Sequence, residues 1–275
     1  MLLLDFLPSL PLRAHVRTYR LIHFTFANAD VIPYKPYPPR PEHTLSFYPR
    51  DREAVQYEGQ PDKITCRSAL VGQHDVVNNR YVGKDFTVIQ VVFQPGALFR
   101  LTGIPAGELN NRYLDAETIF SKDIREVNAR LGSAVDHKEM MGIIECFLLQ
   151  LVNRSKVESH SIDQVGLIML KNKEVSVDWL ARESCLSTRQ FERKFIERTG
   201  ITPKYFMRVA RFAEAYKMKN SSPEKDWLSI AIDCGYYDYQ HLAKDYNQFT
   251  KQSPIAFHLL DMKAPERTFG GSDQF

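Results

Sequence analysis

The stretch that decides the fold occurs twice, as FERKFIERTGITP at residues 191–203 and as LAKDYNQFTKQSP at residues 242–254. In each copy, two large apolar residues stand four positions apart, so they share one face of a helix. Thr-Pro or Ser-Pro closes each copy, and this pair starts a new helix as N-cap and first helical residue. Upstream, the pair LA at 180–181 matches IA at 230–231. The chain therefore contains an internal repeat with a period of about 50 residues.

Each copy predicts two helices joined by a tight turn. In the first copy, Ser176 and Ser187 are suited to cap the two helices, and Gly200 is suited to end the second. In the second copy, Gly235 supplies the turn, although one residue must be inserted there to keep the alignment. A long helix over residues 203–219 joins the copies. The pattern predicts two helix-turn-helix units in an all-α domain.

The combined pattern is similar to that of a known family of regulators. Residues from about 160 to 260 resemble the DNA-binding domain of the AraC/XylS family of bacterial transcription regulators. The matching residues are Leu180, Ala181, Ser187, Phe191, Arg193, Phe195, Gly200, Thr202, Pro203, Arg211, Ala215, Ile230, Ala231, Gly235, Tyr236, Leu242, Tyr246, Ser253 and Pro254. The resemblance implies sequence-specific binding of double-stranded DNA by two recognition helices. Lys251 stands where the family usually has glycine, so we expect the second recognition helix to end less sharply.

The N-terminal part predicts a mostly β domain. A proline-rich segment over residues 33–41 should form an extended loop or a sheet edge, and residues 43–48 should form a strand. Residues 75–82 and 85–93 flank Gly83 and predict a hairpin. The almost continuously apolar run 86–93 is typical of a strand covered on both sides.

A second resemblance concerns this β-rich part. The segment VVFQPGALFRLTGIP at residues 91–105 resembles part of an uncharacterised N-terminal domain of some AraC-type regulators. Related regulators carry a cupin-like β-barrel there. The resemblance implies a barrel or sandwich with a regulatory role, and it names no ligand.

The trailing helices leave one question open. Residues 122–131 and 136–154 have helical periodicity, and the second stretch carries an apolar stripe that runs from Met140 to Leu151. Packing within its own domain is the first interpretation of this stripe, and a dimer interface is the alternative. We expect an α+β chain with three parts. These are a regulatory and self-association domain over 1–156 (β-rich 1–115, helical 116–156), the double helix-turn-helix domain over 157–260, and a flexible tail over 261–275.

Composition excludes several classes of protein. The 275 residues include 36 Lys and Arg against 33 Asp and Glu, so any DNA-binding face must be local. The four cysteines are dispersed, which favours a reducing cytosol over a disulfide framework or a zinc site. Met1–Leu12 lacks a basic start and contains Asp5, Pro8 and Pro11, so we interpret it as mature protein. No run reaches the ~18 apolar residues of a membrane span. We expect a soluble, cytoplasmic protein.

The candidate DNA-reading residues lie on the second helix of each unit. Seven basic residues between 188 and 211 oppose only Glu192 and Glu197, which predicts a phosphate-binding face in the first unit. From residue 224 to 254 the sum is −2, with three lysines against five acids, and Asp245 lies beside Lys244. We therefore expect the first unit to dominate. The base-reading candidates are Arg189, Gln190, Glu192, Arg193, Tyr239, Gln240, His241 and Lys244. The phosphate candidates are Lys194, Arg198, Lys204 and Lys251.

Two other classes of function compete with this one. A helical protein-interaction module without DNA binding would share the fold, but it would not need the basic face. A cupin-type metal-dependent enzyme would need clustered histidines, and the β-rich part offers only His15, His23, His43 and His74 at unsuitable spacings. No catalytic or cofactor motif is present. The expected partners are double-stranded DNA, RNA polymerase, a small-molecule effector and a second copy of the chain.

Overall fold

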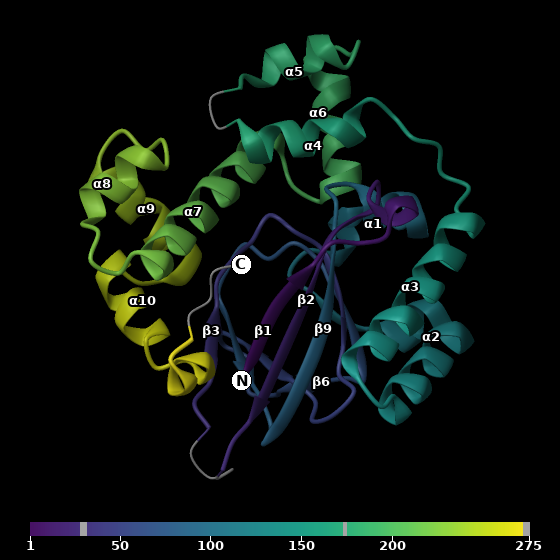
Figure 1. Cartoon of the computed structure of the whole chain (residues 1–275). Coiled ribbons are helices and arrows are strands. Elements are labelled where there is room, and N and C mark those ends of the chain that lie inside the picture. Colours follow the sequence, from purple (N-terminus) through teal and green to yellow (C-terminus); the bar gives the residue numbers. More distant parts are fainter. Residues whose placement is uncertain (28–31, 173–174, 272–275) are drawn as a thin grey trace.

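The β-rich part of the chain, here called the β-domain, consists of two antiparallel sheets (Figure 1). The computed structural model describes residues 1–27, 32–172 and 175–271. The first sheet has the order β1 (Leu2–Phe6), β2 (Val16–Thr25), β9 (Asp85–Phe93), β4 (Thr44–Phe47), β7 (Ser68–Val71) and β10 (Tyr113–Asp115). The second has the order β3 (Lys35–Tyr37), β8 (Asn78–Tyr81), β5 (Ala54–Tyr57) and β6 (Ile64–Thr65).

Strand β9 lies in the middle of the first sheet and is buried on both faces, as its apolar run predicted. Ile89 and Val91 pack into one hydrophobic cluster, whereas Phe86 and Val88 pack into another on the opposite face. This alternation follows from the two-residue period of a strand. The first sheet is therefore sandwiched between the second sheet and a layer of helices.

The predicted hairpin over 75–93 is wrong. Strand β8 pairs with β3 and β5, whereas β9 pairs with β2 and β4, so the two runs belong to different sheets. The backbone at Gly83 packs tightly against Asp51, since a Cβ added there would lie 2.4 Å from the carboxylate. The chain therefore crosses between the sheets at Gly83 instead of reversing. The proline-rich segment forms edge strand β3, as expected.

Five helices of the N-terminal part complete its core. They are η1 (Leu10–Leu12), α1 (Ala97–Thr102), η2 (Ala106–Leu109), α2 (Ala116–Ser133) and α3 (His137–Arg154). The apolar stripe of α3, from Met140 to Leu148, is buried in the same cluster as Ile89 and Val91. The intrachain interpretation of the stripe is thus confirmed, and α3 does not offer it to a second subunit in this structure.

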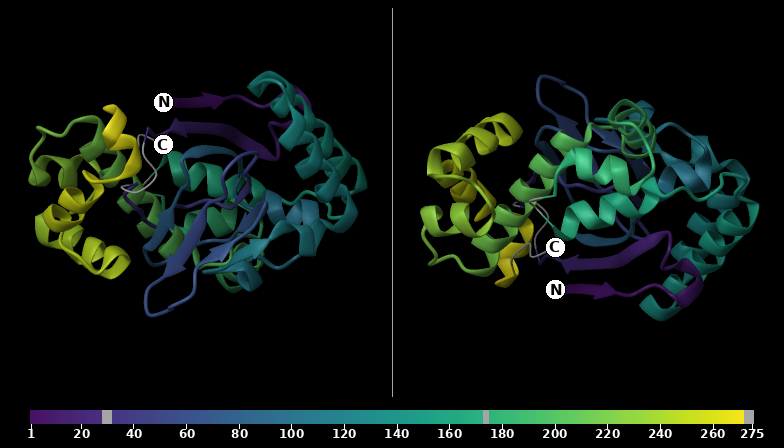
Figure 2. Two further views of the ribbon diagram at one scale, coloured as in Figure 1. Left: turned by 90° about the horizontal axis from the view of Figure 1, so that it is seen from below. Right: turned by 90° about the horizontal axis from the view of Figure 1, so that it is seen from above.

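The C-terminal part is entirely helical, as predicted, and has two separate cores. It contains α4 (Ile162–Lys171), α5 (Val177–Glu183), α6 (Thr188–Thr199), α7 (Pro203–Ser221), α8 (Trp227–Asp233), α9 (Tyr239–Thr250) and α10 (Pro254–Asp261). Phe191, Phe195 and Phe206 belong to the core of the first unit, and Tyr246 and Phe249 to that of the second. Helix α7 supplies side chains to both cores, so it joins the units rigidly. Both views of Figure 2 show the second unit on one side of the β-domain and α2–α3 on the other.

The tail differs from the flexible segment expected after residue 260. Residues Pro265–Phe269 form the short helix η3, which lies beside the β-domain (Figure 1). The Phe269 ring centroid lies 5.6 Å from that of Phe24 and 5.0 Å from that of Phe26. Aromatic packing thus orders the chain as far as this helix, while residues 272–275 lie outside the described part.

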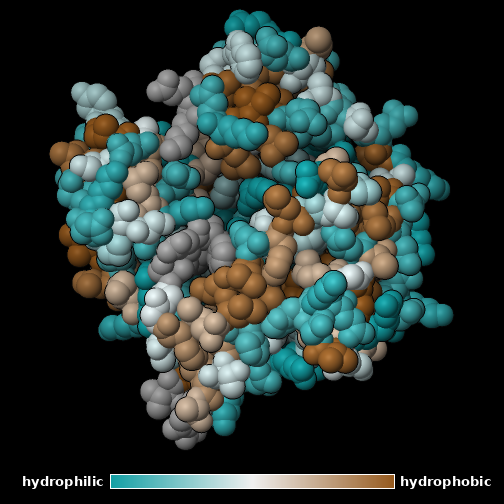
Figure 3. Space-filling model, viewed as in Figure 1, coloured by the Kyte–Doolittle hydropathy of each residue, from teal (hydrophilic) through white to brown (hydrophobic). Residues whose placement is uncertain are grey.

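Figure 3 shows polar and apolar side chains side by side over the helical units, and Leu228, Ile232 and Leu259 are among the exposed apolar residues of the second unit. Apolar side chains also gather over β1, where Leu4 and Phe6 are exposed, as is Leu7 directly after the strand. Within the described residues, no helix combines the length and the apolar character that crossing a membrane requires.

Candidate nucleic-acid interface

Side-chain caps set where each helix of the first unit begins. The Ser176 hydroxyl accepts a hydrogen bond from the Trp179 backbone N–H at 3.1 Å and starts α5. Ser187 starts α6 in a capping box: its hydroxyl accepts from the Gln190 N–H, and Gln190 Oε1 accepts from the Ser187 N–H at 3.1 Å. Gln190, a base-reading candidate, thus uses its carbonyl oxygen to begin the helix.

The turns between the helices use the left-handed region of backbone conformation. Gly235 has φ of +78° in the second unit, which confirms its predicted role. Cys185 occupies the equivalent turn of the first unit with φ of +55°. A side chain in this region costs about 1 kcal/mol or more, so the first turn is the more strained of the two.

The outward face of α6 presents polar candidates to solvent. Arg189, Gln190 and Arg193 are exposed, while Glu192 and Lys194 are half-buried. These residues occupy the first half of the helix, the part that meets base edges in helix-turn-helix proteins. Lys204 is also exposed, at the start of α7. The expected group of candidates therefore lies together around the start of α6.

Helix α9 presents the matching surface of the second unit. Gln240 and Lys244 are exposed, whereas Tyr239 and His241 are half-buried. The His241 ring lies edge-on to Tyr236 at 5.2 Å between centroids, and its backbone N–H donates to the Asp238 cap at 2.7 Å. Gln240 and Lys244 are thus the residues of α9 best placed to reach a base edge.

The expectation that Lys251 blunts the end of α9 is wrong. Lys251 is exposed and has φ of +58°, close to the +84° of Gly200 at the end of α6. Its N–H still donates to the Asn247 carbonyl at 3.0 Å. The lysine therefore adopts the conformation of the glycine that it replaces, at an energetic cost, and its ammonium stays available for a phosphate.

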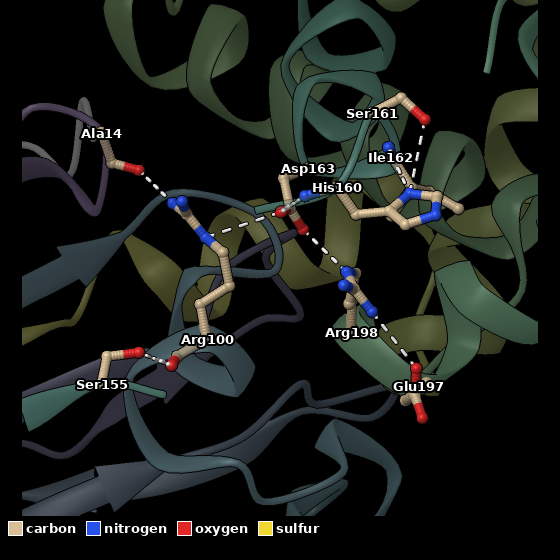
Figure 4. A network of polar contacts seen from close by, with 9 residues as sticks. All are labelled: Ala14, Arg100, Ser155, His160, Ser161, Ile162, Asp163, Glu197 and Arg198. Carbon is tan, nitrogen blue, oxygen red and sulfur yellow. Dashed lines mark hydrogen bonds and ion pairs between the residues drawn. The ribbon is translucent and has the colours of Figure 1, made fainter. Parts of the chain in front are cut away.

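The structure contradicts the phosphate role expected for Arg198. Its side chain is only 7% exposed, and Nε donates to Asp163 Oδ1 at 2.7 Å. The guanidinium lies over the Phe99 ring at 4.9 Å. Arg100 of α1 lies 3.8 Å from the other oxygen of Asp163 (Figure 4). Arg198 therefore joins α4 and α6 to the β-domain side of the molecule.

A similar correction applies to Asp245, which does not lie on the surface beside Lys244. Its side chain is 1% exposed and pairs with Arg208, and Arg211 lies 3.9 Å away. The Tyr236 hydroxyl donates to it at 3.2 Å, and burial together with this carboxylate raises the pKa of Tyr236. Asp245 thus holds α9 on α7 and does not oppose an approaching phosphate. Arg208 and Arg211 both lie at the Asp245 carboxylate. The difference in exposed charge between the first and the second unit is therefore smaller than expected.

Both recognition helices end against the β-domain. The Asn110 side chain donates to the Gly200 carbonyl at 2.6 Å, and the Val77 N–H donates to the Phe249 carbonyl at 2.9 Å. Pro95 also packs on Gly166 of α4. The N-terminal halves of α6 and α9, which carry the reading candidates, point away from these contacts. Sequence reasoning missed this docking because it depends on backbone carbonyls.

Comparison with known proteins agrees with the repeat. A family model described as a helix-turn-helix domain matches residues 180–258, and a model described as a domain of unknown function, DUF6597, matches residues 4–115. The transcriptional activator RhaS of Mannheimia succiniciproducens is 28% identical over 113 residues, which cover 36% of this chain and 41% of that protein. Residues 180–258 are thus similar to the helix-turn-helix domain of transcription regulators such as RhaS, in line with the resemblance to the AraC/XylS family.

Solved structures of AraC-type regulators add only a general likeness. ToxT of Vibrio cholerae has a TM-score of 0.48 at 8% identity, with 88% of this chain and 98% of ToxT covered. The AraC-like activator CuxR has a TM-score of 0.23 at 14% identity, with 64% and 68% covered. Because both TM-scores are below 0.5, the similarity to the AraC/XylS family depends on the sequence match. The helix-turn-helix model spans both units of the repeat, from residue 180 to residue 258.

Proposed function

We propose that this protein is a sequence-specific regulator of transcription that binds double-stranded DNA through both units. The observation that carries this function is the pair of recognition helices on one connecting helix, each with its reading half exposed. Helix α7 has 19 residues and a length of about 28 Å at 1.5 Å per residue. This length is comparable to the roughly 34 Å between successive major-groove segments on one face of a duplex.

The side chains divide into two groups by their chemistry. Arg193 and Arg189 suit guanine, whose O6 and N7 accept both donors of one guanidinium. Gln240 suits adenine, Lys244 suits guanine or a phosphate, and Glu192 can accept from a cytosine amine. The lysines at the edges of the two units would bind phosphates and fix the register. These are Lys194, Lys204 and Lys251.

The remaining parts of the chain have proposed roles of their own. Residues 1–156 would form a regulatory domain that responds to a small-molecule effector, and residues 157–260 would form the DNA-binding domain. Contact with RNA polymerase belongs to the same proposal. A homodimer would need a surface other than the α3 stripe, which is internal. We assign no catalytic role. Within the described residues, no group of three or more His, Cys, Asp or Glu side chains is arranged to hold a metal ion.

Anisotropy titrations of the full chain with labelled duplexes test this function. Arg193→Ala should cost about 1–3 kcal/mol on the cognate site and relax preference at one base pair. Lys204→Ala should weaken all sequences similarly and serves as the matched control. A folded chain without salt-sensitive binding to any duplex would favour the alternative, a protein-interaction module.

A further inference from the structure

Two loops of the β-domain, residues 72–77 and 105–112, lie at the ends of the recognition helices and are here called the bracket. The first loop follows β7, and the second, which contains η2, precedes β10. These two strands pair in the first sheet, with Tyr113 opposite Val71, so both loops start from the same end of the sheet. Because one strand pair carries both loops, the bracket has a fixed position in the β-domain.

Asn111 joins the two loops of the bracket. Its backbone N–H donates to the Gln73 carbonyl at 2.9 Å, and its Oδ1 accepts from the Asp75 N–H at 3.0 Å. Asn111 has φ of +55°, a left-handed conformation that asparagine tolerates better than most residues. The backbone at Gly72 packs on the other loop, since a Cβ added there would lie 1.9 Å from the Leu109 carbonyl oxygen. The two loops therefore form a single element.

Each loop of the bracket holds the end of one recognition helix. The Asn110 side chain donates to the Gly200 carbonyl at the end of α6 at 2.6 Å, and the fit is close, since a Cβ at Gly200 would lie 2.2 Å from Asn110 Oδ1. The Val77 N–H donates to the Phe249 carbonyl near the end of α9 at 2.9 Å, and the Val77 side chain packs on the core of the second unit. Asn110 and its neighbour Asn111 thus connect α6 to the loop that holds α9.

The bracket closes a ring of contacts with α7. The two helix-turn-helix units have separate cores, and α7 supplies side chains to both. A helix of 19 residues can curve, and curvature would change the distance and the rotation between the recognition helices. A second connection, between the ends of α6 and α9, opposes this change because it fixes the two units at a second point.

We propose that the bracket sets the spacing at which the two recognition helices meet DNA, with Asn110 and Asn111 as its positioning residues. The proposal rests on the function proposed above, in which α6 and α9 bind one duplex. One extra base pair separates two segments of a duplex by about 3.4 Å more and rotates one of them by about 35°. A rigid pair of helices binds one spacing without an ordering cost, whereas a pair joined by α7 alone binds neighbouring spacings as well, with lower affinity. The β-domain thus contributes to specificity without touching DNA.

Electron paramagnetic resonance measures the spacing of the units without DNA. Spin labels on Cys185 and on Tyr237→Cys place one probe on the exposed turn of each unit, after Cys146→Ser removes the other exposed cysteine. The double variant Asn110→Ala/Asn111→Gly removes both side-chain bonds and keeps a residue suited to φ of +55°. It should widen the distribution of distances between the labels at least about twofold. Equal widths in the parent chain and the double variant would overturn the role of the bracket.

Binding to duplexes of different spacing tests the consequence for DNA. The probe is a duplex of about 30 base pairs that the wild type selects from a random library, with and without one base pair inserted between the segments that the two units protect. The insertion should weaken binding of the wild type about tenfold or more, and binding of the double variant about threefold or less. Glu108→Ala, at an exposed position of η2, is the matched control and should keep the wild-type ratio. Equal ratios in the wild type and the double variant would overturn the proposal.

The two experiments separate this proposal from the proposed function. A wild type that binds no duplex, or that protects only one segment, would count against the function, while the distances between the labels still decide whether the bracket fixes the two helices. Asn111→Gly alone, at an exposed position, should change both measurements in the same direction and decides the matter if the double variant does not fold.

Discussion

Replacement of Arg198 by alanine distinguishes a structural arginine from a phosphate contact. The change would leave Asp163 buried, with the His160 N–H at 2.8 Å and Arg100 at 3.8 Å as remaining partners. Removing one partner of a buried ion pair lowers the free energy of unfolding by about 3–5 kcal/mol. Because Asp163 keeps two partners, we expect a loss near the lower end of this range. Loss of the contact over Phe99 adds a smaller cost. We expect Arg198→Ala to destabilise the chain by about 3–4 kcal/mol.

Urea unfolding and the salt dependence of DNA binding measure this prediction. With a slope of about 2–3 kcal/mol per molar urea, the midpoint should fall by about 1–2 M. Because Arg198 does not contact phosphate, the slope of log K for DNA binding against log salt should be the same in Arg198→Ala as in the wild type, in conditions where the variant is folded. Lys204→Ala should do the opposite, with an unchanged midpoint and a slope shallower by about 0.9. The double variant Arg198→Met/Asp163→Leu should recover most of the stability. A stable Arg198→Ala with a shallower slope would refute this account of the network.

Three further predictions concern binding, stability and pH. Arg193→Ala should weaken cognate binding more than Lys244→Ala does, and a larger loss from Lys244→Ala would make α9 the dominant reader. Lys251→Gly should raise stability by about 1 kcal/mol in thermal unfolding, because φ of +58° strains a lysine; no gain would argue against strain at this position. Burial lowers the pKa of His43 to about 4 and that of His74 to about 3, from an ordinary 6.5. The unfolded chain thus binds more protons below pH 6.5, and stability should fall with pH from 6.5 to about 4 by about 1.4 kcal/mol per pH unit for each ring. Equal urea midpoints at pH 7.5 and 5 would contradict this.

The sequence predicted the elements that depend on local pattern. The buried pair Phe191 and Phe195 recurs as Leu242 and Tyr246, and both pairs lie in the expected cores. The serine caps and the turn at Gly235 were also correct. Such features depend on helical periodicity and on the conformational range of single residues, which a sequence shows directly.

The expectations for Arg198 and Asp245 were wrong because the charges were counted without asking which face of the helix carries each residue. Arg198 is seven residues after Phe191 and three after Phe195, so it falls on the buried stripe of α6. Asp245 falls three residues after Leu242, on the buried stripe of α9. Both are buried and paired with a residue distant in sequence. Helical spacing could have predicted their burial, but only the tertiary structure supplies their partners.

Long-range packing explains the other differences. Gly83 looked like the turn of a hairpin, but Asp51 packs against its backbone and the chain changes sheets there. The tail lacked a helical pattern, and its order depends on the contacts of Phe269 with Phe24 and of Glu266 with Lys35, more than 200 residues earlier. The local sequence pattern does not predict contacts between residues so far apart in the chain.

The central claim is that both units of this chain bind one duplex. Its most direct test is the affinity of the full chain for a labelled duplex of about 30 base pairs, roughly three turns, over a range of salt concentrations. Three phosphate-binding lysines at about 0.9 each would give a slope of log K against log salt of about −2.7 or steeper. Arg193→Ala and Lys244→Ala should each lower the affinity for the cognate duplex. Binding that does not change with salt, or that only one of the two substitutions weakens, would contradict the claim.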